Sequence, residues 1–264
     1  MCGIAGYSLS TNSNVERTLA AQALLAAIAE RGADAVGYAH RAPGARYPTV
    51  TKQRTPASML LERVAVPAEA TQLLVHVRDY TKGHPSIAAN NHPVRHGPVI
   101  GIHNGIITND DELLAQYSCA RVEPRMTVDS EAIFALAAHS RSEARAFEAL
   151  QGAMAAAWLD EREPEILHLA RGVGRPLWLG EGREGAFFAS TEHALGVLEH
   201  YCGLKLRKRE VREGTLIELV GGEVTRRERF RTNVYVEDDP LPAVRAPQER
   251  EFCLTRLASI VAAA

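Results

Sequence analysis

Cys2 is the residue whose type and position point most directly to chemistry. A methionine followed by a small residue is normally removed, and this removal would leave Cys2 with a free α-amine. A thiol is the strongest protein nucleophile near neutral pH, and an α-amine with a pKa of about 8 can act as its base, directly or through water. One residue would then supply both groups. The alternative is that Cys2 is only a small buried residue at the start of a strand.

A series of short blocks rich in Gly, His, Asn and acidic residues accompanies Cys2. The blocks are Cys2-Gly3-Ile4-Ala5-Gly6, Arg31–Gly37, His76–Gly83, Asn91-His92-Pro93, His103–Ile107 and Val128–Glu131. In this order and at these spacings they resemble the class II glutamine amidotransferase domain, an N-terminal-nucleophile (Ntn) hydrolase. This domain is the glutaminase half of glucosamine-6-phosphate synthase and of amidophosphoribosyltransferase. The resemblance covers about residues 2–220, and the shared order makes it far more specific than any single block.

The resemblance implies that Arg78 and Asp129 bind the amino-acid head of glutamine. Arg78 matches the arginine that holds the α-carboxylate, to which a planar guanidinium donates two parallel hydrogen bonds. Asp129 matches the carboxylate that receives the α-ammonium group. The alternatives are a surface ion pair for Arg78 and an N-cap for Asp129, before the helix that starts at Ser130. The capping role and the binding role of Asp129 are compatible.

The same resemblance implies that Asn104 and Gly105 form the oxyanion hole. The Asn104 amide and the Gly105 backbone N–H would hold the tetrahedral oxyanion. The alternative is an ordinary Asn-Gly turn. Further matching positions line or support the site: Thr81 lines the glutamine pocket, and Arg31, His76 and His103 are supporting residues.

Asp79 and Lys82 depart from the pattern. The glucosamine-6-phosphate synthase block reads HxRWATHG, with Trp and His where this chain has Asp79 and Lys82, whereas the amidophosphoribosyltransferase block, HVRYxTxG, is closer. Because these positions help to cover the bound glutamine, we expect the departures to affect gating and affinity rather than the covalent chemistry.

We predict no metal site and no organic cofactor. The histidines at 84, 92, 96 and 103 are close in sequence, but Pro93 interrupts the only pair at helical spacing, and no Cys or carboxylate cluster joins them. The basic residues of 205–209 and 226–231 are interpreted as a solvated strand face, with a docking face for an acidic partner as the alternative.

The composition is that of an ordinary globular protein. The 264 residues are 46% hydrophobic and 23% charged, and 30 Lys+Arg against 32 Asp+Glu give a net charge of −2. Such a balance does not favour nucleic-acid or membrane binding, and the sequence contains no apolar run long enough to span a bilayer. The scattered cysteines and the lack of a signal peptide predict a cytoplasmic protein with reduced thiols.

Apolar periodicity and turn residues predict the elements that position these blocks. A helix is expected from the Ser13/Glu16 capping box to Arg31-Gly32, with Gly32 in a left-handed C-terminal position. Further helices are expected at 109, 129, 191–200 and 248–264. Strands are expected at 3–9, 36–40, 73–77, 99–102, 153–159, 165–170, 177–179, 186–189, 207–211, 215–219 and 223–227. Gly221-Gly222 is expected to join the last two strands in a hairpin.

These elements predict an antiparallel α+β fold. The resemblance makes it specific: a four-layer αββα sandwich of the Ntn-hydrolase type with two antiparallel sheets. We expect a glutamine amidotransferase domain over residues 2–236. Residues 237–264 are expected to form a linker and a C-terminal tail, whose helix is a possible docking element for a partner.

The expected activity is hydrolysis of the L-glutamine side-chain amide through a thioester on Cys2. We expect a free-standing glutaminase that supplies ammonia to a separate synthetase or ligase subunit. One alternative is an amidohydrolase that cleaves another γ-glutamyl amide. The other is a non-catalytic binding or regulatory module.

Overall fold

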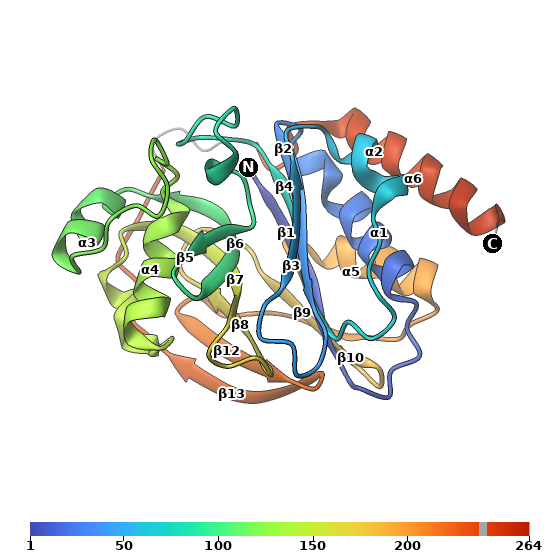
Figure 1. Cartoon of the computed structure of the whole chain (residues 1–264). Helices are drawn as coiled ribbons and strands as arrows, with labels where there is room; N and C mark the ends of the chain where they lie inside the picture. The colour runs from blue at the N-terminus through green and yellow to red at the C-terminus, as the bar shows by residue number, and fades with distance from the viewer. Residues whose placement is uncertain (238–241, 264) are drawn as a thin grey trace.

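Two antiparallel sheets face one another between layers of helices (Figure 1), in a computed structural model that describes residues 1–237 and 242–263. This arrangement confirms the expected αββα sandwich. None of the helices in these two ranges is long and apolar enough to cross a membrane.

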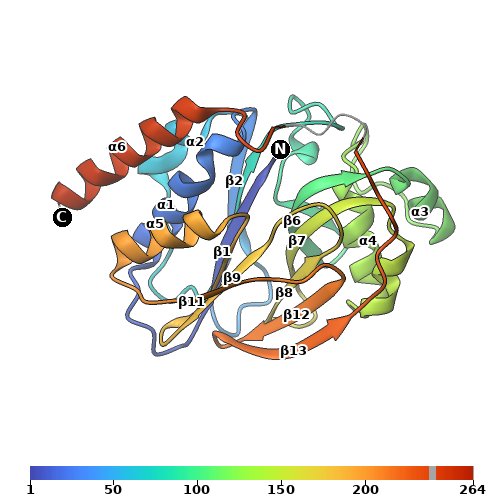
Figure 2. The ribbon, with the colours of Figure 1, turned by 180° about the vertical axis from the view of Figure 1, so that it is seen from behind.

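The first sheet has seven strands in the order β11-β9-β10-β1-β4-β2-β3. Its strands are β1 Gly3–Leu9, β2 Ala35–Arg41, β3 Thr49–Gln53, β4 Gln72–Arg78, β9 Trp178–Gly182, β10 Gly185–Ala189 and β11 Arg207–Glu210. Its outer face is covered by α1 Arg17–Ile28, α2 Ala57–Leu60, α5 Glu192–Cys202 and α6 Pro247–Ala263 (Figure 2). The short helices η1 Ala29–Arg31 and η2 Leu61–Arg63 continue α1 and α2.

The second sheet has six strands in the order β13-β12-β8-β7-β6-β5. Its strands are β5 Val94–His96, β6 Val99–Ile107, β7 Gly152–Asp160, β8 Ile166–Arg171, β12 Thr215–Val220 and β13 Glu223–Arg229. The helices on its side are η3 Ala88–Asn90, α3 Asp110–Gln116, α4 Ser130–Ser140 and η4 Ala144–Ala149. The expected hairpin between β12 and β13 is confirmed, with Gly221 and Gly222 both at positive φ.

Alternation along the strands produces separate apolar layers. Ile4, Leu74 and Ile102 are buried between the two sheets, whereas Ala5, Leu73 and Val75 face the helices of the first sheet. Successive side chains of a strand point to opposite faces, so one strand contributes to two layers. The inter-sheet layer therefore places the neighbouring strands β1 and β4 opposite β6.

The limits of α1 differ from the expectation. Glu16, rather than Ser13, is the N-cap, and its carboxylate accepts hydrogen bonds from the backbone N–H groups of Thr18 and Leu19. Gly32 is extended, with φ −180°, and is not a left-handed cap. A Cβ there would overlap the backbone of Arg78. Glycine is required at position 32 because η1 approaches the end of β4 closely.

The C-terminal helix packs against the rest of the molecule. The expected helix is present as α6, and its Cys253 and Leu257 are completely buried in the layer that also holds Leu24 of α1. Of the expected linker, residues 238–241 lie outside the described residues, as does Ala264 at the end of the expected helix. Partner docking by α6 stays a prediction.

Candidate active site

Three of the expected site residues project from the facing sides of the two sheets. Ile4, Leu74 and Ile102 mark the inter-sheet faces of their strands. Residues two or four positions further along share these faces, so Cys2, Arg78 and Asn104 do as well. The pairing of Gly3 with Val77 places Cys2 next to Arg78.

Cys2 is held by its neighbours through both its backbone and its thiol. The thiol donates to the backbone oxygen of Asp79 at 3.4 Å, and Nε of Arg31 donates to the Cys2 carbonyl at 2.8 Å. Burial raises the pKa of the thiol, while the positive charge of Arg78 acts in the opposite direction. Cys2 therefore needs a base to become a thiolate near neutral pH.

Arg78 organises the loop that follows β4. Its guanidinium donates to the backbone oxygens of Lys82 at 2.9 Å, of Gly83 and of Asn90, and to the Asn91 side-chain oxygen at 2.7 Å. The residue is only 2% exposed. A substrate carboxylate would have to replace some of these acceptors, so binding requires a rearrangement of this loop.

Asp129 lies at the start of α4 and points back toward β6. Its carboxylate accepts a hydrogen bond from the backbone N–H of Ile107 at 2.7 Å. It occupies the N-cap position of α4, but its side chain makes no capping hydrogen bond. The alternative that Asp129 serves as an N-cap is therefore correct for its position only. Burial raises its pKa to about 6, although the Ile107 hydrogen bond works against that increase.

Asn104 and Gly105 are strand residues and do not form a turn. They pair with Ala155 and Met154 of β7. Asn104 is fully buried, and within the described part of the chain neither atom of its amide group has a hydrogen-bond partner. Gly105 has φ +153°, and a Cβ there would overlap the Ala153 carbonyl oxygen. Because a buried amide is costly to leave unpaired, Asn104 is suited to a group that arrives only with a ligand.

The histidines of this region contact one another and the backbone. His76 and His92 stack with ring centroids 4.1 Å apart, and Nε2 of His76 lies 3.0 Å from the His103 carbonyl oxygen. Nδ1 of His103 lies 2.8 Å from the Ser130 hydroxyl. Burial lowers the pKa of His76 and of His103 to about 3, so both rings are neutral near pH 7. Their contacts link β4, β6 and α4 behind the site.

The space in front of Cys2 is closed in this structure. A cavity of only about 10 Å³ remains, room for one water molecule. The residues around it are Cys2, Arg78, Asp79, Tyr80, Thr81, Lys82, His92, His103, Gly105, Val128, Asp129 and Ser130. Arg31, His76 and Asn104 are not among them. Lys82 fastens the loop by contacts to Asp110 at 2.6 Å and to Asp111 at 3.1 Å, so a molecule larger than water can enter only if the loop moves.

The sequence did not indicate the contacts of Asp79, one of the two positions that differ from the family pattern. Asp79 pairs with the N-terminal ammonium group at 2.5 Å and with Arg245 at 3.2 Å. Asn90 and Asn91, which accept hydrogen bonds from Arg78, were also missed as contacts. The Asn91-His92-Pro93 block was the available signal for the second of them.

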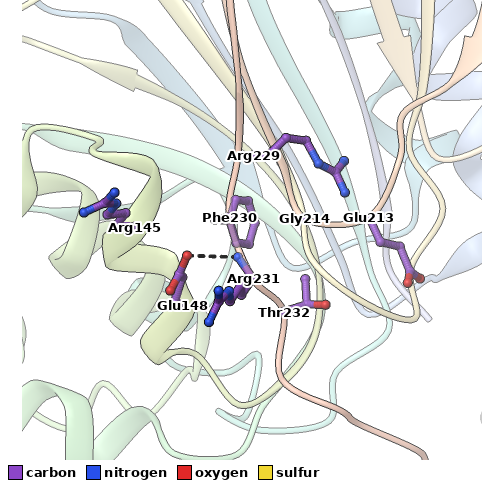
Figure 3. Close-up of a pocket in the computed structure, with 8 residues that line it drawn as sticks. All are labelled: Arg145, Glu148, Glu213, Gly214, Arg229, Phe230, Arg231 and Thr232. Atoms are coloured by element: carbon purple, nitrogen blue, oxygen red, sulfur yellow. Dashed lines mark hydrogen bonds between the residues drawn. The ribbon is translucent and has the colours of Figure 1, made fainter.

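A larger pocket of about 870 Å³ lies elsewhere and shares no residue with this cavity (Figure 3). It is lined by Arg145, Glu148, Glu213, Gly214, Arg229, Phe230, Arg231 and Thr232. The guanidinium groups of Arg145 and Arg229 point to different sides, and Glu148 is engaged by the Arg231 backbone N–H at 3.0 Å. The pocket therefore presents no convergent set of polar groups.

Comparisons with known proteins show similarity to glutamine amidotransferases. Residues 78–196 match a family model described as a glutamine amidotransferase domain. The glutamine–fructose-6-phosphate aminotransferase (isomerizing) of Chlamydia muridarum is 31% identical over 214 residues, which are 78% of this chain and 34% of that protein. Its namesake from Caulobacter vibrioides is 33% identical over 207 residues, 74% of this chain and 32% of that protein.

Solved structures share the fold. The glutamine phosphoribosylpyrophosphate amidotransferase from B. subtilis, complexed with ADP and GMP, has a TM-score of 0.69 at 20% identity, covering 88% of this chain and 50% of that one. A structure described as the allosteric regulatory enzyme of purine biosynthesis has a TM-score of 0.67 at 19% identity, with the same coverage. The chain thus spans about a third of the length of these curated relatives and half of these solved chains.

Proposed function

The chain carries a class II glutamine amidotransferase domain, and from this premise we propose that it hydrolyses the side-chain amide of L-glutamine through a thioester on Cys2. The observation that carries the proposal is the fully buried amide of Asn104. Within the described residues it has no partner, and it lies on the inter-sheet face shared by Cys2 and Arg78. An oxyanion formed on attack by the thiolate would supply the missing acceptor.

The reaction follows from groups of the chain and water. Once Met1 is removed, the α-amine of Cys2 takes the thiol proton, and the thiolate attacks the side-chain carbonyl carbon. Asn104 and the Gly105 N–H stabilise the oxyanion. The C–N bond breaks as the ammonium proton passes to the leaving nitrogen, which departs as ammonia. Water then attacks the thioester, releasing glutamate and restoring the thiol.

Arg78 and Asp129 select the substrate by its amino-acid head. The guanidinium would exchange loop acceptors for the α-carboxylate, and the Asp129 carboxylate would pair with the α-ammonium group. Thr81 lines the same space. Arg31, His76 and His103 act on the site indirectly, through the Cys2 carbonyl and through the strands that carry the binding groups.

Glutamate release from L-glutamine by purified protein tests the proposal. We expect turnover that is lost in Cys2→Ala and kept in Cys119→Ala, since Cys119 is also a partly exposed thiol but lies outside the site. Mass spectrometry is expected to show that Met1 is absent from the active protein. Equal turnover by wild type and Cys2→Ala, or full activity in protein that retains Met1, would contradict the mechanism.

A second γ-glutamyl amide is the alternative substrate. Arg78 and Asp129 would recognise only the head that all γ-glutamyl amides share, so these residues do not select an unsubstituted amide. The values of kcat/KM for L-glutamine and for an N-substituted γ-glutamyl amide distinguish the two. A clear preference for the substituted amide would favour the amidohydrolase. A non-catalytic module would hydrolyse neither.

We further propose that the ammonia is used by a separate synthetase or ligase subunit in the cytoplasm. The described elements are all accounted for by the two sheets and their helical layers, which supports an acceptor site outside these residues. The measurement is the ratio of free ammonia to glutamate released by the purified protein. A ratio near one is expected without a partner, and a lower ratio would place an acceptor on this chain.

A further inference from the structure

Asp79 connects the amino terminus to the segment before α6, next to Cys2. Its carboxylate pairs with the ammonium group of Met1 at 2.5 Å and with Nε of Arg245 at 3.2 Å. The backbone oxygen of the same residue accepts the hydrogen bond from the Cys2 thiol. One residue therefore contacts the thiol through its backbone and the chain's amino terminus through its side chain.

We propose that Asp79 and Arg245 hold the α-amine that Met1 removal leaves on Cys2, with Asp79 as a positioning residue for glutamine hydrolysis. The inference rests on the proposed function, in which that amine is the base. The nitrogen atoms of Met1 and Cys2 are separated by three bonds, or about 3 Å. The Asp79 side chain, only 15% exposed, already points to this place and can follow the amine over that distance.

The backbone around Asp79 is fixed on both sides. The preceding Arg78 is tied to the loop by its four acceptors, and the following residue, Tyr80, donates its backbone N–H to the Asp34 carboxylate at 2.9 Å. The carboxylate can therefore orient the amine without movement of the main chain. Orientation matters because the amine must meet both the thiol and the leaving nitrogen.

Arg245 is placed by the segment that leads into α6. The backbone N–H groups of Arg245 and Ala246 both donate to the Glu30 carbonyl, at 2.9 and 2.8 Å. Glu30 precedes Arg31, whose side chain holds the Cys2 carbonyl, and the Glu30 carboxylate also pairs with Arg250 at 2.9 Å. The segment thus connects to Cys2 by two routes, one through η1 and one through Asp79.

The charges around the amine act with opposite signs. The Asp79 carboxylate favours the ammonium form, whereas Arg245, Arg78 and Arg31 favour the neutral amine. Further carboxylates around the site are Asp129, which lines the same small cavity as Cys2, Asp34, near Arg78, and Glu30, which is paired with Arg250. The base must be neutral to accept the thiol proton, so its protonation sets the acid limb of the pH–rate profile. Loss of Asp79 and loss of Arg245 should therefore move this limb in opposite directions.

The pH dependence of kcat in single variants tests the inference. In Asp79→Asn we expect a several-fold lower kcat and an acid limb lower by about one pH unit, and in Arg245→Met an acid limb higher by about half a unit. Asp79→Glu keeps a carboxylate and is expected to keep the wild-type limb. KM for glutamine should change less than kcat does, because Arg78 and Asp129, which are proposed to bind the amino-acid head, are untouched. Mass spectrometry checks that Met1 is removed from each variant.

A second readout does not need turnover. The pH at which the α-amine becomes reactive toward an acetylating reagent, followed by mass spectrometry, should show the same order: Asp79→Asn lowest, wild type next, Arg245→Met highest. This order would support the positioning of the α-amine by Asp79 and Arg245 even if the protein releases no glutamate. In that case only the proposed function would be wrong. Midpoints that coincide, or a raised KM in Asp79→Asn without a shifted limb, would show that Asp79 only supports the loop and would overturn the inference.

Discussion

Asn104 allows the effect of a residue on activity to be separated from its effect on stability. Its amide is fully buried and, among the described residues, unpaired, so the folded protein pays for desolvation without a hydrogen bond in return. We predict that Asn104→Ala lowers kcat by roughly 10²- to 10³-fold, the usual loss for one oxyanion donor. We expect its melting temperature to stay equal to that of wild type or to rise. Thermal unfolding and glutamate release measure the two effects.

Asn109→Ala is the matched control. The Asn109 amide donates to the Ala149 carbonyl at 3.0 Å and accepts from the Gln151 N–H at 2.9 Å, outside the lining of the site. Its removal should cost about 1–3 kcal/mol of unfolding free energy and leave kcat unchanged. A marked loss of stability in Asn104→Ala would show that its amide has a structural partner.

We expect Asp129 to make glutamine binding dependent on pH. Burial raises the pKa of its carboxyl to about 6, and the ionised form is the one that can pair with the α-ammonium group. We predict that KM for glutamine rises as the pH falls through about 6. In Asp129→Asn we expect KM to be high and nearly independent of pH over this range. A wild-type KM that is flat between pH 5 and 8 would contradict this role.

The same shift determines a contribution to stability. The folded pKa lies above the unfolded value of about 3.9, so the folded state binds this proton more tightly. The stabilising contribution of the carboxyl is full below about pH 4 and is lost as the pH rises through about 6. The unfolding free energy of Asp129→Asn relative to wild type is therefore expected to increase over this interval.

The sequence predicted that Cys2, Arg78 and Asp129 lie together, but it did not predict their contacts. Cys2, Arg78 and Asp129 occur in ordered blocks, and the structure brings them around one small space. The contact of Asp79 with Arg245 joins positions far apart in the chain and depends on how the C-terminal segment meets η1. No local spacing carries that information. The catalytic roles stay predictions until they are tested.

At the scale of elements, the loop after β4 is the part that must move. Lys82 joins this loop to α3 through Asp110, which also pairs with Arg121 at 2.7 Å. We predict that Lys82→Met speeds backbone amide exchange across residues 79–91, because the loop loses its contact with α3. Lys82 is 38% exposed, so the cost in unfolding free energy should stay below about 1 kcal/mol. Hydrogen-exchange mass spectrometry measures the change.

Lys208→Met provides the comparison for this prediction. Lys208 is also a partly exposed lysine in an ion pair, and its partner is Glu199 at 2.7 Å. This pair lies outside the loop after β4. Its loss should leave exchange in residues 79–91 unchanged. Equal exchange in the two variants would mean that the Arg78 contacts alone hold the loop closed.

The elements with strong apolar patterns could be predicted, and the weak ones could not. Strands such as β4 and β7 are completely buried and were expected within one or two residues of their observed ends. β3 was missed because it is a largely exposed edge strand with no alternating apolar face, and β5 because it has only three residues. Gly32 was misassigned because its requirement comes from the Arg78 backbone, a tertiary contact.

At the scale of the whole molecule, α6 belongs to the outer helical layer of the first sheet. Leu257 is completely buried among residues of that layer, whereas Val261 on the same helix is 41% exposed. We predict that Leu257→Ala lowers the unfolding free energy by about 2–5 kcal/mol, and that Val261→Ala changes it by no more than about 0.5 kcal/mol. Chemical denaturation followed by circular dichroism measures both.

The same pair of variants shows whether the packing of α6 affects the position of Arg245 and, through it, the active site. The segment before α6 positions Arg245 against Asp79, so a loosened α6 should reproduce part of the Arg245→Met shift in the acid limb. Leu257→Ala is therefore expected to move the limb upward by less than Arg245→Met does, and Val261→Ala to leave it in place. If Leu257→Ala unfolds more readily but keeps the wild-type limb, the backbone bonds to Glu30 are sufficient to position Arg245. In that case α6 stabilises the molecule without affecting the protonation of the Cys2 α-amine.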